Sequence, residues 1–201
     1  MPVKSVQKLI AIVSAALAVA IVSAGAAQAC NYTGAQQVFK PWGDQHSYVL
    51  APDGGFEAGG QGWSLGGGAG TVGENEPFAL GGAADTRSLS LPAGSTAVSP
   101  PICMSLDTPS FRLVARNSGD PSSGLRVEAT YALLGLVRTK TVSTVYGGST
   151  WAPSQQMSTV LSLSTIVGTV IPSAIQIRIT PLGSGGHWQV DDLYIDPFAR
   201  H

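Results

Sequence analysis

Acidic side chains stand at two places in this chain where together they could hold a cation. Glu57 follows the pair Gly54-Gly55 near the start, and Asp191-Asp192 interrupts an apolar run near the end. Calcium takes several oxygen ligands, carboxylate and carbonyl mixed, from flexible loops. The two segments can share one ion if the first and last strands of the fold are neighbours, as they often are in antiparallel jelly rolls.

The ligands of this predicted metal site follow from the same arrangement. Glu57 and Asp191 would each supply a carboxylate, Gly55 a carbonyl, and Glu74 a further side-chain oxygen, with Asp192 in the same set. The expected cofactor is therefore a structural calcium ion. The alternative interpretation is that Glu57 and the aspartates only accept hydrogen bonds from loop amides.

The last strand indicates how the acidic pair is held. Trp188 and Val190 would share one face of a regular strand, and so would Leu193 and Ile195, but the two pairs are three positions apart. A β-bulge at Asp191-Asp192 would bring both pairs to the same face, because bulges redirect side chains. Adjacent carboxylates at a bulge repel each other unless one is solvated or bound to a cation.

Aromatic side chains are the first candidates for contact with a sugar, because sugar rings stack on exposed aromatic faces. Trp42 stands in an irregular stretch and is expected to be the freest of the four tryptophans. Trp63, Trp151 and Trp188 stand at strand starts or in phase with apolar residues, which predicts structural roles. Tyr131 is a further candidate ring.

Polar side chains on strands complete the predicted ligand-binding set. Arg112, Arg178 and Gln176 alternate with apolar residues and are expected on solvated strand faces, where they could hydrogen-bond a polar ligand. The alternative is that they form ordinary solvated sheet surface.

Motifs of catalysis are weak in this sequence. The stretch Gly62–Gly66 matches the G-x-S-x-G pattern of a nucleophile elbow, but glycines follow it where a helix is needed. His46, His187 and His201 are too scattered for a zinc motif. We therefore expect a protein that is not an enzyme; a secreted hydrolase would need two carboxylates that face each other across a cleft.

The elements that must position these residues are strands. Apolar and polar residues alternate over 111–116, 125–131 and 175–180, and turn sequences rich in glycine and proline separate them. Further strands are expected at 47–51, 63–65, 70–74, 88–91, 97–105, 136–145, 157–163 and 188–195. Short strands at this spacing predict an all-β fold, an antiparallel β-sandwich of jelly-roll type.

The first 29 residues are predicted to be a signal peptide rather than part of the fold. Lys4 and Lys8 precede an apolar run from Leu9 to Ala24, and Ala27-Gln28-Ala29 offers small residues for cleavage. Residues 30–201 would then form a single secreted domain. Cleavage leaves nine basic and twelve acidic side chains, a net charge of −3 that gives no basic surface for nucleic acid. No membrane association is expected after cleavage.

The two cysteines, Cys30 and Cys103, are expected to pair, because disulfides are the default outside the cell. The competing hypothesis is a lipoprotein anchored at Cys30, which would remove the disulfide.

The combination Gly54-Gly55-Phe56-Glu57, then Gly62-Trp63, then the run Trp188–Ile195 resembles the galactose-binding-like jelly rolls of carbohydrate-binding modules. The resemblance implies a structural calcium bound by Glu57 and Asp191. The mature chain also looks like a group of small secreted actinobacterial proteins without an assigned role, through Pro41–Asp44 and Pro100–Cys103. No catalytic module is expected beside this domain, whereas sugar-binding modules are usually joined to one.

These observations predict a secreted, non-catalytic binding module for a carbohydrate or cell-envelope polymer, with polysaccharide or cell-wall glycan as the partner. The alternative is a structural or protein-interaction module of the envelope.

Overall fold

The structure is a computed structural model, and it describes residues 32–103, 110–133, 136–158 and 174–196. The predicted signal peptide and Cys30 lie outside the described residues. The disulfide between Cys30 and Cys103, the lipoprotein alternative and secretion therefore stay predictions.

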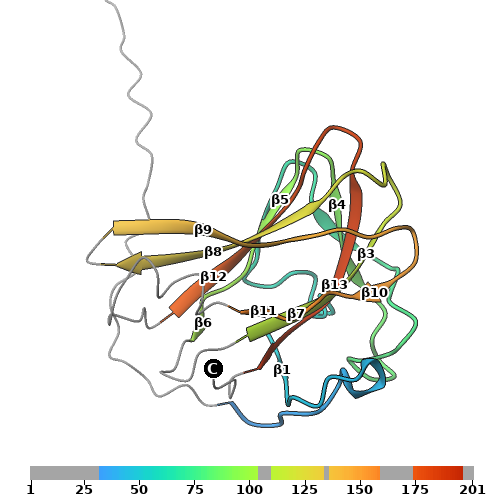
Figure 1. The fold of residues 1–201 in the computed structure, drawn as a ribbon, viewed down its shortest axis with the longest axis vertical. Helices are drawn as coiled ribbons and strands as arrows, with labels where there is room; N and C mark the ends of the chain where they lie inside the picture. The colour runs from blue at the N-terminus through green and yellow to red at the C-terminus, as the bar shows by residue number, and fades with distance from the viewer. Residues whose placement is uncertain (1–31, 104–109, 134–135, 159–173, 197–201) are drawn as a thin grey trace, which may run out of the picture.

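Two antiparallel sheets form the described part of the chain (Figure 1). The first has the order β10 (Ala152–Pro153), β7 (Ser110–Asn117), β13 (His187–Asp196), β4 (Ser88–Pro92), β3 (Gly70–Val72), with β1 (Val49–Leu50) on β13 and β11 (Met157–Ser158) on β7. The second has the order β2 (Ser64–Gly66), β5 (Thr96–Val98), β12 (Ala174–Pro181), β8 (Leu125–Leu133), β9 (Leu136–Val145), with β6 (Ile102–Cys103) on β12. The predicted antiparallel β-sandwich is confirmed.

Alternating apolar residues from both sheets meet in one core. Val127 and Ala129 of β8 and Ile177 and Ile179 of β12 are buried there together with Leu113 of β7. A strand that buries one face needs this period of two, because successive side chains point to opposite faces. The alternation therefore predicted these strands correctly, whereas β10 was missed and the strand expected over 97–105 is divided into β5 and β6.

The bulge predicted in the last strand is present. The register between β13 and β7 shifts between Asp191 and Tyr194, and Asp192 has a φ of +49°. The shift lets Trp188 and Leu193 on its two sides enter the same core. Aspartate tolerates positive φ better than most residues, which suits it to this position.

A second, smaller apolar cluster lies on the outer face of the first sheet. It consists of Phe39, Tyr48, Val114, Trp151 and Tyr194, with Val38 and Leu80 packed against it. The segment before β1, which contains the 3₁₀ turn η1 (Lys40–Trp42), thus covers the outer face of β7 and β13. For this reason β7 is buried on both faces along most of its length, and not on one face as its sequence pattern indicated.

The opening and closing strands are neighbours, as predicted. Val49 pairs with Ile195 across β1 and β13. The contact continues past β1, because the amide of Ala51 donates to the carbonyl of Leu193 at 2.8 Å and the amide of Leu193 donates to the carbonyl of Gly54 at 3.0 Å.

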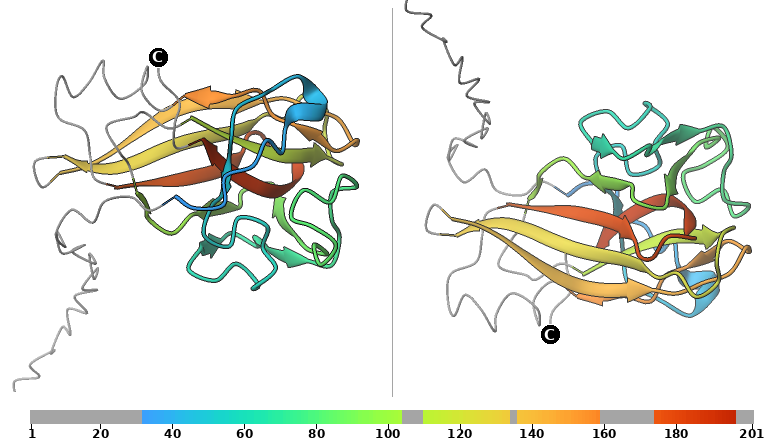
Figure 2. Two further views of the ribbon diagram at one scale, coloured as in Figure 1. Left: turned by 90° about the horizontal axis from the view of Figure 1, so that it is seen from below. Right: turned by 90° about the horizontal axis from the view of Figure 1, so that it is seen from above.

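Three segments gather at one end of the molecule in all three views (Figures 1 and 2). They are η1, the loop between β3 and β4 (residues 73–87) and the segment after β9 (residues 146–151). The end of β8 and the start of β9 lie at the opposite end. In the described part of the chain, no helix has the length and apolar content needed to cross a membrane.

Candidate functional site

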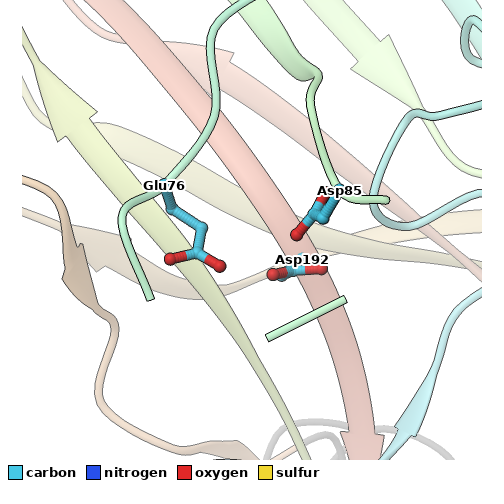
Figure 3. Close-up of side chains that lie close together, drawn as sticks. All are labelled: Glu76, Asp85 and Asp192. Carbon is cyan, nitrogen blue, oxygen red and sulfur yellow. The ribbon is translucent and has the colours of Figure 1, made fainter. Parts of the chain in front are cut away.

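Three carboxylates from distant parts of the chain point toward one another (Figure 3). They belong to Glu76 and Asp85 in the loop 73–87 and to Asp192 at the bulge of β13. One oxygen of each lies within 4.8 Å of the other two. We call these three residues the acidic cluster.

The bulge holds the Asp192 side of the acidic cluster. The carboxylate of Asp191 accepts the amide of Asp192 at 2.9 Å and the amide of Glu76 at 3.4 Å. Both aspartates are fully buried. Asp191 therefore links the loop to the bulge by hydrogen bonds, while the carboxylate of Asp192 faces those of Glu76 and Asp85.

The loop 73–87 takes its shape from carboxylates that bind its own amides. Glu76 accepts the amides of Phe78 and Leu80, and Asp85 accepts the amide of Gly81 at 3.2 Å. Glu76 and Asp85 therefore have two roles: they fix the shape of the loop, and they contribute carboxylates to the acidic cluster.

Among the residues that the structure describes, no basic side chain neutralises the acidic cluster. Within the described residues, no oxygen of Glu76, Asp85 or Asp192 forms an ion pair with a basic side chain. Both carboxylate oxygens of Asp192 and Oδ1 of Asp85 are buried without a hydrogen-bond donor. Buried charge without a partner is costly, so this arrangement needs protons or a cation.

The pKa values of these groups respond to that environment. Burial, and then the charges of Asp192 and Asp85, raises the pKa of Asp191 to about 9. Burial, and then the charges of Asp85 and Glu76, raises the pKa of Asp192. Burial also raises the pKa of Asp85, and the charges of Glu57 and Glu76 add to it. A bound cation would oppose each of these shifts, because it favours the ionised form.

The donor set fits calcium. It offers carboxylate oxygens from two loop positions and one strand position, which is the ligand type that calcium takes. The unpartnered oxygens of Asp85 and Asp192 are the atoms free to bind it. Glu76, Asp85 and Asp192 would hold the ion, which would supply the missing positive charge.

Of the five predicted metal residues, only Asp192 belongs to the acidic cluster, and Asp191, Gly55 and Glu57 lie around it. At Gly55, a Cβ atom would lie 3.3 Å from Oδ1 of Asp192, so the glycine leaves room beside the carboxylate. Glu57 accepts the amides of Thr86 at 2.8 Å and Arg87 at 2.6 Å, which is the alternative role that its sequence position left open.

Glu74 lies apart from the acidic cluster. It forms an ion pair with Arg116 and accepts a hydrogen bond from Gln189 at 2.9 Å. Glu76, two positions later, takes the place at the acidic cluster, and sequence reasoning missed it together with Asp85. Asp85 looked like an ordinary turn residue, and only the distance to Asp192 in the folded chain distinguishes it.

The predicted ligand-binding residues do not form one group. Gln176 and Arg178 lie on the outward face of β12, where Arg178 is exposed and Gln176 donates to the carbonyl of Ser99 at 3.0 Å. Tyr131 is 3% exposed and belongs to the core. Trp42 is 38% exposed, whereas the other three tryptophans are buried, as expected.

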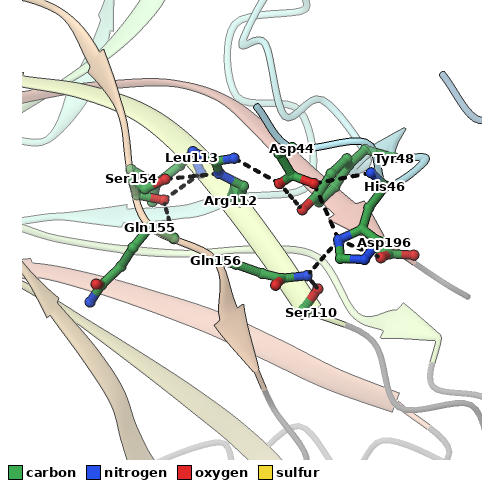
Figure 4. A network of polar contacts seen from close by, with 10 residues as sticks. All are labelled: Asp44, His46, Tyr48, Ser110, Arg112, Leu113, Ser154, Gln155, Gln156 and Asp196. Carbon is green, nitrogen blue, oxygen red and sulfur yellow. Dashed lines mark hydrogen bonds and ion pairs between the residues drawn. The ribbon is translucent and has the colours of Figure 1, made fainter. Parts of the chain in front are cut away.

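Arg112 was expected on a solvated face, and this expectation is wrong. The side chain is buried under the segment that precedes β1, in the polar network of Figure 4. Its guanidinium donates to Asp44 at 2.7 Å and to the carbonyl of Ser154 at 2.8 Å, and it lies over the ring of Phe39. Tyr48 donates to the same carboxylate at 2.7 Å. Arg112 therefore anchors the opening segment to β7.

An open cavity of about 340 Å³ is lined by residues of β9, β10 and the segment between them, together with Ala115 of β7 and Trp188 of β13. Its lining carries no charged side chain and includes hydroxyl and amide groups of Thr144, Thr150 and Gln155. Tyr146 at its margin is 69% exposed. The sequence does not distinguish Tyr146 from the other tyrosines, because nothing in its local pattern predicts its place beside a cavity.

The fold is shared with carbohydrate-binding modules of known structure. A family 16 carbohydrate-binding module matches with a TM-score of 0.52 at 14% identity, over 73% of this chain and 99% of that one. A xylan-binding domain of family 22 matches with a TM-score of 0.50 at 16% identity, over 79% and 99%. The tandem of two family 22 modules from Paenibacillus barcinonensis Xyn10C matches with a TM-score of 0.53 at 12% identity, over 77% of this chain and 46% of that one.

Neither a scan against protein-family models nor a search of curated proteins found a match. At these identities the structural likeness defines the fold, a jelly-roll β-sandwich, and confirms that prediction. The resemblance to secreted actinobacterial proteins stays a prediction.

Proposed function

We propose that this protein is a secreted, non-catalytic carbohydrate-binding module whose loops are braced by a structural calcium ion. The observation that carries the proposal is the open, uncharged cavity beside the exposed ring of Tyr146, in a jelly-roll fold shared with modules of this kind.

The chemistry of the cavity suits a neutral sugar. Its volume lies within the range of small-ligand sites. Hydroxyl and amide side chains can exchange hydrogen bonds with sugar hydroxyls, and an exposed aromatic ring can cover the apolar face of a pyranose. An anionic or cationic ligand would find no opposite charge in the lining.

A glycine makes room for the Tyr146 ring. A Cβ atom at Gly124, the residue before β8, would lie 3.1 Å from Cε1 of Tyr146 and 2.7 Å from a methyl group of Thr144. The missing side chain at Gly124 therefore lets the ring pack beside the start of β8, while the rest of Tyr146 stays exposed for contact with a ligand.

A non-catalytic role is supported by the separation of the two sites. Glycoside hydrolysis uses a pair of carboxylates that flank the scissile bond. The carboxylates of Glu76, Asp85 and Asp192 are turned toward one another in a buried cluster, and none of them lines the cavity.

Affinity gel electrophoresis tests the proposal. Xylan is the first polysaccharide to include, because the family 22 domain of similar fold is a xylan-binding domain, and β-glucan and galactan extend the panel. We expect retardation by at least one polymer, about tenfold weaker binding by Tyr146→Ala, and near-normal binding by Tyr146→Phe, which keeps the ring. Val137→Ala, at a site 70% exposed on the β8–β9 hairpin, is the matched control.

The absence of retardation by any polymer in the panel would contradict a carbohydrate ligand. It would favour the protein-interaction alternative. Equal binding by Tyr146→Ala and the unmodified protein would instead contradict the cavity as the site.

A further inference from the structure

A pair of exposed aromatic rings stands beside the acidic cluster. Trp42 of η1 and Phe78 of the loop 73–87 are each 38% exposed, and their rings meet edge to face with centroids 4.8 Å apart. Phe78 lies between Glu76 and Asp85 in sequence, so both ends of the short segment that carries it belong to the acidic cluster.

The carboxylate of Glu76 links the two features directly. The same side chain that faces Asp192 also accepts the amide of Phe78. The loop is held at a second point by Tyr194, whose hydroxyl donates to the carbonyl of Leu80 at 3.0 Å. The placement of the Phe78 ring against Trp42 thus depends on the position of Glu76.

Repulsion between the carboxylates of the acidic cluster opposes the observed position of Glu76. Glu76 and Asp85 approach the fixed Asp192 without a described basic partner. A divalent cation would change the sign of the interaction and draw both loop carboxylates toward β13. Ion binding would therefore fix the segment that carries Phe78.

We propose that the Trp42–Phe78 pair is a second sugar-stacking contact, and that binding of a divalent cation by the acidic cluster assembles it. This inference rests on the proposed carbohydrate-binding function and adds to it a defined subsite and a dependence on the cation.

The size of the pair fits a sugar ring better than a protein surface. Aromatic side chains present ~150–250 Å² each, so two rings that are 38% exposed offer roughly 100–200 Å² together. A stable protein partner needs about 800 Å² on each side. One or two stacked pyranose rings would cover the pair.

The Trp42–Phe78 pair and the cavity both adjoin the second apolar cluster. Trp151, next to the cavity residues Thr150 and Ala152, shares the second apolar cluster with Phe39 and Leu80. Phe39 in turn contacts Trp42, with ring centroids 6.2 Å apart. The segments that carry these residues, η1, the loop 73–87 and the segment after β9, lie at the same end of the molecule (Figure 2).

Iodide quenching of tryptophan fluorescence tests the assembly step. Trp42 is the tryptophan that quencher can reach, because Trp63, Trp151 and Trp188 are at most 8% exposed. Addition of calcium chloride to chelator-treated protein should reduce quenching, because Phe78 then shields Trp42. Phe78→Ala should abolish that change while it keeps the calcium-dependent rise in melting temperature, since its backbone amide is retained.

Affinity electrophoresis on the polymer that retards the unmodified protein tests the contact. We expect about five- to tenfold weaker binding for Trp42→Ala, for Phe78→Ala and for the chelated protein, with Val137→Ala as control. Equal quenching with and without calcium, when the melting temperature does rise, would overturn the assembly while the cation site stands. Unchanged affinity in Phe78→Ala would overturn the sugar contact, whereas a failure of the unmodified protein to bind any polymer would overturn the proposed function itself.

Discussion

Replacement of Asp192 by asparagine should have opposite effects on stability with and without calcium. The side chain is fully buried, neither of its oxygens has a described donor, and it faces Glu76 and Asp85 within 4.8 Å. Asparagine keeps the size of the side chain and removes its charge. In chelator, Asp192→Asn should therefore unfold at a higher temperature than the unmodified protein.

The magnitude follows from the geometry. Two unit charges 4.8 Å apart repel by roughly 3–4 kcal/mol at an effective dielectric constant of 20. Proton uptake limits the cost that remains, so we expect a gain of about 1–3 kcal/mol in chelator. With calcium at 100 times its dissociation constant, the unmodified protein gains about 2.7 kcal/mol. For a domain of 150–250 residues that gain raises the melting temperature by about 5–11 °C.

Differential scanning calorimetry of both proteins, in chelator and over a calcium titration, measures these quantities. Glu74→Gln is the matched control, because Glu74 pairs with Arg116 and lies outside the acidic cluster. Its calcium response should equal that of the unmodified protein. A calcium-dependent shift of the same size in Asp192→Asn, or no shift in any of the three proteins, would refute the cation site.

Three further predictions concern the scaffold. Gly54→Ala should lower the free energy of unfolding by about 1–3 kcal/mol in urea titrations, because its Cβ atom would lie 2.7 Å from the Leu193 carbonyl. Gly73→Ala is the control and should be near neutral, because a Cβ atom there meets open space. Equal effects of the two substitutions would contradict the close approach of the first and last strands. Ile177→Ala should cost about 2–5 kcal/mol by the same assay, because it empties a fully packed core position, and a loss below 1 kcal/mol would mean that the two sheets are not packed as described. Burial acts to raise the pKa of Asp44, but hydrogen bonds from Tyr48, the His46 amide and Arg112 outweigh it and lower the pKa. The ionised Asp44 should therefore add to the free energy of unfolding above about pH 4, and this contribution should be lost as the pH falls through the lowered pKa. Asp44→Asn should flatten that part of the pH–stability curve, and an unchanged curve would refute the role of the ion pair with Arg112.

The acidic cluster shows where prediction from sequence stops. The bulge at Asp191-Asp192 could be predicted because it is a local conflict of parity, visible in the order of apolar residues along one strand. The neighbouring positions of the first and last strands followed from the expected fold. Glu76 and Asp85 could not be found this way, because each is an ordinary polar loop residue until the loop between β3 and β4 folds back onto β13.

The alternation of apolar and polar residues determined the two-sheet fold, since a strand with one buried face permits no other period. The positions of Trp63, Trp151 and Trp188 at strand starts or in phase with apolar residues likewise predicted that these three rings are buried. Tertiary structure alone decided that Arg112 is buried, because the segment that covers the outer face of β7 lies about 70 residues earlier in the chain. It likewise decided that Trp42 meets Phe78 and that an uncharged cavity opens beside Tyr146. These features depend on distances between segments remote in sequence, and a local pattern carries no information about such distances.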